Sequence, residues 1–352
     1  MAVTEFGTNH PAAVKLWSRK MFQEALKQTW LYRFIGESDN SMIQILDDTQ
    51  KGPGDRITVP LRYQLTSLGI QGDGTLEGSE EELEIYTDNL FIDQLRNAVR
   101  SGGRMSEQRV PFSVREQAQM ALSDWWANVF DVSGFNQLCG IGGADTREAG
   151  NNATVRPVAA TVVLPPGAAN TAGVNDVTSS FTLDLIDLAV EKAKTNTPAV
   201  RPIKVDGDDY YVAFLHPYQV KSLRTNSSGG QWLDIQKAAM QGGKIDDNPI
   251  FTGAMGVYNN VIIHESTRVQ PDSDDTTSGV ANVYRAILCG AQAAVLAFGQ
   301  DNAGNKISWT EELFDYGNQL GVSGGMIYGL KKTVFNSLDF GVITIYSYGA
   351  EG

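Results

Sequence analysis

One pattern in the sequence could activate a serine nucleophile. The segment 321–325 (Gly-Val-Ser-Gly-Gly) fits G-x-S-x-G, in which the central serine attacks a carbonyl carbon from a tight strand-to-helix turn. That chemistry also needs a histidine later in the chain as general base, and the last histidine here is His264. Because glycines flank Ser323, we interpret the segment as a turn between strands. A hydrolase that uses Ser323 remains the alternative.

The other residues that could do chemistry lack the spacing of a known site. The histidines show no metal-ligand spacing with one another or with the two cysteines, and neither acidic cluster matches an EF-hand loop. A glycine-rich segment at 139–143 has no predicted strand leading into it, as a phosphate cradle would require. We therefore expect buried thiols, a structural His216, solvated acidic turns, and no catalytic residue, metal or cofactor. The residues considered are His10, His216, His264, Cys139, Cys289, Asp272, Asp274, Asp275 and the range 301–305.

A reversal of charge along the chain suggests contacts between subunits. Between Asp73 and Asp93 lie eight acidic residues and no Lys or Arg, and five arginines follow between 96 and 115 with one acid among them. Two solvated faces would explain the pattern, and so would docking of the acidic segment on the basic segment of a neighbouring copy. The candidate contact residues are Glu77, Glu80, Glu81, Glu82, Glu84, Arg96, Arg100, Arg104 and Arg109.

The acidic segment belongs to a predicted β-ribbon. Hydrophobic residues alternate strictly with other residues from Ile57 to Leu65, which indicates a half-buried strand. Pro60 cannot donate a ladder hydrogen bond, so we expect an edge strand. After a glycine-rich tip, the extended run 83–92 can return antiparallel. The eleven residues from Asp55 to Leu65 would reach about 35 Å at roughly 3.3 Å each. Such a ribbon could project far enough to need cover from a neighbour.

A long helix and an α/β region follow the ribbon. Ser113 and Glu116 have capping-box spacing, and Val114, Ala118, Ala121, Leu122, Trp125 and Val129 are predicted to form one apolar face. Further on, the pattern predicts helices over 181–194 and 232–240, with Pro217 at the first turn of another. It also predicts strands over 210–216, 257–264 and 283–288, and in the last fifty residues.

Composition narrows the class of protein. The 352 residues carry a net charge of −13, which disfavours dedicated binding to nucleic acid or to anionic membranes. The first residues lack a basic start followed by an apolar core, and no apolar stretch is long enough to span a bilayer. We expect no secretion signal, no membrane contact, and assembly in a cytoplasm.

Three runs resemble the major capsid proteins of tailed bacteriophages, in the branch of N-four-type podophages. They are KGPGDRITVPLR from Lys51, FIDQLRNAVRSGGRMSEQRVPF from Phe91 and ALSDWWANVFD from Ala121, and the opening FGTNHPAAVKLWSRKMF is similar too. The resemblance implies an α+β, Hong Kong 97-like (Johnson) fold. It implies an N-arm (1–50), an extended β-hairpin loop (51–110), a peripheral domain with the spine helix (111–178), an α/β axial domain (179–300) and return strands of the peripheral domain (301–352).

The same resemblance implies a structural function rather than an enzymatic one. The expected protein self-assembles as hexamers and pentamers into an icosahedral head that encloses double-stranded DNA without sequence-specific binding. Scaffolding, portal and decoration proteins are the expected partners, and the virion is the expected location. An encapsulin-like compartment, which shares the fold and encloses cargo enzymes, is the alternative.

Overall fold

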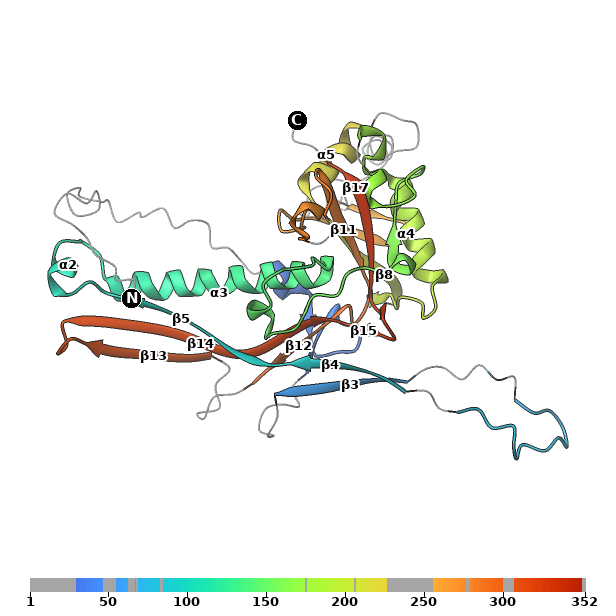
Figure 1. Ribbon diagram of the computed structural model, residues 1–352, viewed down its shortest axis with the longest axis horizontal. Helices are drawn as coiled ribbons and strands as arrows, with labels where there is room; N and C mark the ends of the chain where they lie inside the picture. The colour runs from blue at the N-terminus through green and yellow to red at the C-terminus, as the bar shows by residue number, and fades with distance from the viewer. Residues whose placement is uncertain are drawn as a thin grey trace.

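The protein is an elongated mixed α/β subunit with a projecting ribbon (Figure 1). The computed structural model describes residues 30–46, 55–62, 67, 69–82, 85–174, 176–205, 207–226, 256–276, 279–299 and 307–349. The first 29 residues of the expected N-arm and the predicted helix over 232–240 lie outside these ranges. The helices are α2 (Arg104–Gln108), α3 (Val114–Cys139), α4 (Leu183–Thr195) and α5 (Pro217–Thr225). The strands are β1 (Ile35–Gly36), β2 (Ile43–Leu46), β3 (Arg56–Arg62), β4 (Ile85–Phe91), β5 (Asp93–Arg100), β6 (Val162–Val163), β7 (Ile203–Val205), β8 (Asp208–Leu215), β9 (Gly256–Tyr258), β10 (Val261–Glu265), β11 (Val283–Cys289), β12 (Ala294–Phe298), β13 (Ile307–Phe314), β14 (Gln319–Lys332), β15 (Val334–Phe335), β16 (Leu338–Asp339) and β17 (Val342–Tyr348).

Strand β14 is the centre of a long six-stranded sheet that carries the spine helix. The main order is β1-β2-β12-β14-β13, and β5 also pairs with β14 in antiparallel register from Gly321 opposite Arg100 to Tyr328 opposite Asp93. Helix α3 lies along one face of this sheet (Figure 1). Ala118 and Leu122 of the helix pack against Val322 of β14. The sheet and the helix together form a stiff rod.

The ends of α3 follow the predicted capping, but its buried face differs from the prediction. The Ser113 hydroxyl accepts a hydrogen bond from the Glu116 N–H at 3.3 Å, and Gly140 ends the helix with φ 65°. Ala121 is exposed, and Trp126, rather than Trp125, is the more buried tryptophan. The Trp126 ring packs on Tyr328 with a centroid distance of 5.9 Å. The N-terminal half of α3 is buried mainly at Ala118, Leu122 and Trp126, whereas most positions from 129 to 139 are buried.

The glycine pattern at 321–325 is not a turn, as we had expected, but the middle of strand β14. Each glycine makes room for a neighbouring side chain. A Cβ at Gly324 would lie 3.3 Å from Trp126 Nε1, and one at Gly321 would lie 2.6 Å from Cε2 of Phe314. The glycines therefore serve close packing on both faces of the sheet, a role that sequence alone does not separate from turn formation.

A second, seven-stranded sheet forms the α/β part of the subunit. Its main order is β6-β17-β11-β8-β10-β9, with β7 pairing with β8. Helix α4 buries Leu185, Ile186 and Ala189 in a core with β17 residues such as Ile343. The predicted helix over 181–194 and the predicted strands at 210–216 and 283–288 are confirmed. The predicted strand 257–264 is instead two antiparallel strands, β9 and β10, because Asn259 and Asn260 adopt positive φ and turn the chain.

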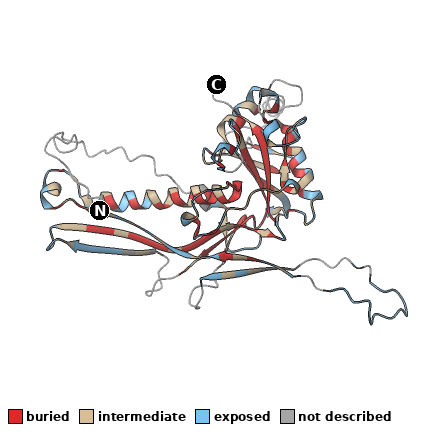
Figure 2. Cartoon of the chain, viewed as in Figure 1, coloured by how far each residue is buried: buried red, intermediate tan, exposed pale blue. Residues whose placement is uncertain are grey.

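Strands β3 and β4 form the predicted two-stranded ribbon. Their antiparallel register runs from Arg56 opposite Phe91 to Arg62 opposite Ile85. Pro60 lies in β3, whose described pairing is with β4 alone, as its missing N–H predicts. Figure 2 shows the exposed ribbon beside the buried interior of the body. After the ribbon, β5 joins the long sheet by pairing with β14, so residues 93–100 of the expected extended loop (51–110) run along the body of the subunit.

Candidate assembly surfaces

The root of the ribbon is fixed firmly to the body. Leu90 is fully buried against Val295 and Ala297 of β12. Asp88 forms an ion pair with Lys331 of β14 and accepts a hydrogen bond from the Val334 N–H at 3.1 Å. These contacts orient β4, and with it the root of the ribbon, relative to the long sheet.

The tip of the ribbon is acidic and exposed. Glu77, Glu80, Glu81 and Glu82 are all exposed, whereas Glu84 lies outside the described residues. Two of the carboxylates also hold the local backbone: Glu81 Oε2 accepts from the Ser67 N–H and Glu80 Oε2 from the Gly78 N–H, both at 2.7 Å. The tip is therefore negatively charged, and two of its carboxylates also hydrogen-bond to its own backbone.

The candidate arginines lie toward the opposite end of the molecule. Arg96 and Arg100 are on β5, Arg104 begins α2, and Arg109 follows it. In Figure 1, β5 leads from the root of the ribbon away from its tip, and α2 is at the far end of the subunit. The structure thus does not bring the acidic and basic candidates together within one chain. Any contact between them must join two copies.

The five arginines differ in exposure and in the contacts of their side chains. The half-buried Arg100 stacks its guanidinium on the Phe314 ring at 4.4 Å. The side chain of Arg96 lies beside Gly325, where an added Cβ would come within 2.8 Å of its Cγ. Arg104 and Arg109 are exposed. Arg115, the fifth arginine of the run, is engaged in a bidentate pair with Glu311 at 2.6–2.9 Å, which raises its pKa.

A buried ionic cluster connects the end of α3 to the second sheet, and sequence reasoning missed it. Arg285 of β11 contacts Asp272 at 2.6 Å and Asp275 at 2.8 Å. Its Nη1 also donates to the carbonyl oxygens of Cys139 and Gly140, at 3.2 and 2.7 Å. These two aspartates are 1% and 3% exposed, so our interpretation of them as solvated turns is wrong. Nothing in the sequence indicated this cluster, because an arginine in a strand does not show which carboxylates it will contact in the folded chain.

The geometry offers no catalytic site in the described residues. Ser323 Oγ donates to the Thr310 carbonyl oxygen at 3.3 Å, and both described histidines belong to the other sheet region. His216 caps α5 by accepting from the Tyr218 N–H at 3.3 Å, and burial lowers its pKa to about 4. Its predicted structural role is therefore confirmed. Cys139 and Cys289 are free and buried, and burial raises the pKa of the Cys139 thiol to about 11, which makes it a poor nucleophile.

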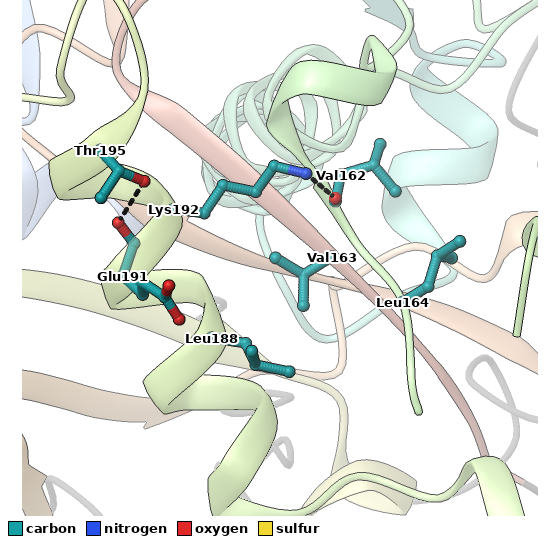
Figure 3. A pocket seen from close by; sticks show the side chains of 7 residues that line it. All are labelled: Val162, Val163, Leu164, Leu188, Glu191, Lys192 and Thr195. Atoms are coloured by element: carbon teal, nitrogen blue, oxygen red, sulfur yellow. Dashed lines mark hydrogen bonds between the residues drawn. The ribbon is translucent and has the colours of Figure 1, made fainter. Parts of the chain in front are cut away.

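A surface pocket beside α4 also lacks reactive chemistry (Figure 3). It has a volume of about 310 Å³ and lies between α4 and β6. Lys192 Nζ donates to the Val162 and Ala159 carbonyl oxygens at 2.6 and 3.0 Å, and Thr195 Oγ1 donates to the Glu191 carbonyl oxygen at 2.9 Å. The Lys192 hydrogen bonds hold the edge strand β6 on α4, and the Thr195 hydrogen bond lies within α4. The polar groups of this pocket therefore serve the packing of the strand on the helix.

Metal binding and membrane insertion were the remaining possibilities for the described residues. Across the described part of the chain, no group of three or more His, Cys, Asp or Glu side chains is placed to hold a metal ion. Among the described helices, none has both the length and the apolar composition needed to cross a bilayer.

The shape of the subunit matches those that build phage shells. The capsid of Ralstonia phage GP4 aligns with a TM-score of 0.80 and 34% identity over 99% of both chains. The capsid subunit of cyanophage Pam1 shares the fold, with a TM-score of 0.77 and 20% identity over 100% of both chains. The major capsid protein of Pseudomonas phage KPP25 is 28% identical over 366 residues, which cover 94% of each sequence. The family model described as phage capsid protein matches residues 5–351. The chain belongs to this family of phage capsid proteins.

These similarities confirm several predictions made from the sequence. The resemblance to phage major capsid proteins and the α+β, Hong Kong 97-like fold are confirmed. The protein is a major capsid protein, a structural component of the virion that forms icosahedral capsids. The alternative of an encapsulin-like compartment is not supported, because the matched relatives are phage capsids.

Proposed function

We propose that the protein assembles as hexamers and pentamers around double-stranded DNA, and that the acidic ribbon tip of one copy docks on the arginine-bearing end of its neighbour. The observation that supports the docking is the separation of charge within one subunit. Glu77, Glu80, Glu81 and Glu82 lie at the ribbon tip, and Arg96, Arg100, Arg104 and Arg109 lie toward the other end. Glu84 extends the same acidic run in the sequence.

The buried root of the ribbon supports this proposal. Because Leu90 and the Asp88–Lys331 pair fix the root, the ordering of the ribbon is partly complete before a neighbour arrives. Exposed ion pairs contribute only about 0.2–1 kcal/mol each, so the docking sets register and partner choice more than total affinity. Because the same weak contact is repeated between all neighbouring copies of a closed shell, its total contribution to assembly is still significant.

Charge reversal at the tip tests the docking. We expect Glu80→Lys, Glu81→Lys and Glu82→Lys together to impair shell formation while the monomer stays folded. The matched set Glu80→Gln, Glu81→Gln and Glu82→Gln keeps oxygen acceptors for the tip backbone and removes only charge, so it should impair assembly in the same direction. Light scattering on a sizing column and negative-stain images measure both.

Two controls separate docking from general charge effects. Asp208→Lys with Asp209→Lys changes exposed acids at the start of β8, away from both surfaces, and should leave assembly intact. Adding Arg96→Glu and Arg100→Glu to the lysine set should restore part of the assembly. Normal particles from the lysine set at both low and high salt would remove the docking proposal while leaving the capsid function untouched.

The remaining expectations extend the same function. We propose assembly in the host cytoplasm, with scaffolding, portal and decoration proteins as partners, DNA enclosed without sequence-specific binding, and no enzymatic activity. The division into N-arm (1–50), extended loop (51–110), peripheral domain (111–178 and 301–352) and axial domain (179–300) belongs to this proposal. Nucleic acid inside purified shells supports it. Loss of an esterase activity in Ser323→Ala would contradict the proposed lack of catalysis.

A further inference from the structure

An exposed tyrosine stands at the tip of the β13–β14 hairpin. Tyr316 is fully exposed at 109% of its reference area, and Leu313, three residues earlier in β13, is 65% exposed. Asp315 and Tyr316 both have positive φ, 53° and 52°, a conformation that a tyrosine rarely adopts. A strained backbone that presents a bare aromatic ring is a reason to look for a binding partner.

Hydrogen bonds fix the backbone of this turn. The Gly317 N–H donates to the Phe314 carbonyl oxygen at 3.1 Å and closes the turn. Asn318 Nδ2 donates to Asp315 Oδ2 at 3.1 Å, and its Oδ1 accepts from the Arg104 N–H at 3.3 Å. Because the turn is tied to α2, the backbone that carries the tyrosine is ordered before it meets a partner, which lowers the entropic cost of binding.

The same hairpin carries a cavity on the face of the sheet opposite α3. The cavity has a volume of about 480 Å³. Its floor is Ser323 of β14, with Ala98 and Thr310 on the neighbouring strands in register. Its lining residues are Ala98, Val99, Arg100, Thr310, Glu312, Phe314, Gly321, Val322 and Ser323. It is open because the residues that meet at its floor, Ser323, Ala98 and Thr310, have small side chains.

The chemistry of the cavity suits a phenol ring. Phe314 and the Arg100 guanidinium stack together at one side of it and offer an aromatic edge and a cation. Exposed Glu312 supplies a carboxylate that can accept a hydrogen bond from a phenolic hydroxyl. An aromatic ring with a polar end is therefore a better match than an aliphatic chain.

The Tyr316 ring does not occupy this cavity in its own chain, because it is fully exposed. The floor residue Ser323 lies four residues into β14 from Gln319, roughly 13 Å at about 3.3 Å per residue. We propose that Tyr316 of one copy inserts into the cavity of a second copy. A ring and a cavity on one hairpin form a self-complementary surface, so two copies can make the contact reciprocally.

Cysteine cross-linking between two single variants tests the proposal. Subunits carrying Tyr316→Cys and subunits carrying Ser323→Cys are co-assembled into shells and treated with a bismaleimide cross-linker, which spans the length of the lost tyrosine side chain, and denaturing gels measure covalent dimers. The native Cys139 and Cys289 are buried and do not compete. We expect dimers from this mixture that neither variant forms alone. Met120→Cys, exposed on α3 at the other face of the sheet, replaces Ser323→Cys in the control.

Each outcome decides the proposal. No dimer, or equal dimer with Met120→Cys, overturns it. Dimers between Leu76→Cys of the ribbon tip and Ser323→Cys, in place of Tyr316→Cys, would show instead that a ribbon occupies the cavity. A second measurement uses assembled shells: Tyr316→Ala should dissociate at a lower denaturant concentration than Tyr316→Phe, which keeps the ring. Equal midpoints for these two variants also overturn the proposal, whatever the result for the acidic tip.

Discussion

Replacing Arg285 by methionine should destabilise the subunit strongly. The guanidinium is 3% exposed and contacts two carboxylates that are 1% and 0% exposed. It also donates to the two carbonyl oxygens at the end of α3. Methionine fills a similar volume but leaves both carboxylates buried without this cation. The change therefore tests whether the cluster holds the spine helix on the second sheet.

The expected loss of unfolding free energy follows from the burial of the ion pairs. Removing one partner of a buried ion pair costs about 3–5 kcal/mol, because a charge is left uncompensated in a medium of low dielectric. A domain has a free energy of unfolding of about 5–15 kcal/mol, so the loss would be a large fraction of the whole. Arg156 also contacts Asp275 and can compensate part of one charge, which places the expected loss nearer 3 kcal/mol.

Urea unfolding of the dissociated subunit, followed by circular dichroism, measures the loss. Arg147→Met is the matched control, because Arg147 pairs with Asp145 on the surface and its removal should leave the midpoint unchanged. Adding Asp272→Asn and Asp275→Asn to Arg285→Met should recover part of the stability, since the buried charges are then gone. A loss below about 1 kcal/mol for Arg285→Met would refute this account of the cluster.

Three further predictions concern other buried groups. Burial lowers the pKa of His216 to about 4, so its contribution to stability is present above about pH 6.5 and is lost as the pH falls toward 4. Thermal melts over this pH range should show a smaller loss of stability in His216→Asn, which keeps a capping oxygen but does not titrate. Lys332→Met should cost about 3–5 kcal/mol by leaving Asp339 buried and unpaired, and Lys332→Met with Asp339→Leu should be more stable than the single variant by urea unfolding. Gly329→Ala should cost about 1–3 kcal/mol in the same assay, because its Cβ would overlap a carbonyl oxygen of β4, whereas Gly173→Ala, with no atom nearer than 3.5 Å, should be neutral.

Local patterns predicted many of the elements. Period-two alternation identified β3, and capping residues located the start of α3 and, through Pro217, the start of α5. These signals are reliable because they depend on residues close together in the chain. The charge reversal likewise identified the acidic tip and the arginines as separate groups, although their contact remains a proposal.

The sequence by itself determined the helical and extended segments, the free thiols and the family, because these depend on local periodicity and on runs of residues that can be compared directly. Only the tertiary structure decided which residues meet. It placed 321–325 inside β14, paired 93–100 with β14 in the long sheet, and paired Arg285 with distant aspartates. The physical reason is that glycine and ionic residues take their roles from neighbours across the fold. A glycine can allow a turn or a close approach, and a carboxylate is solvated or buried according to whether a cation reaches it.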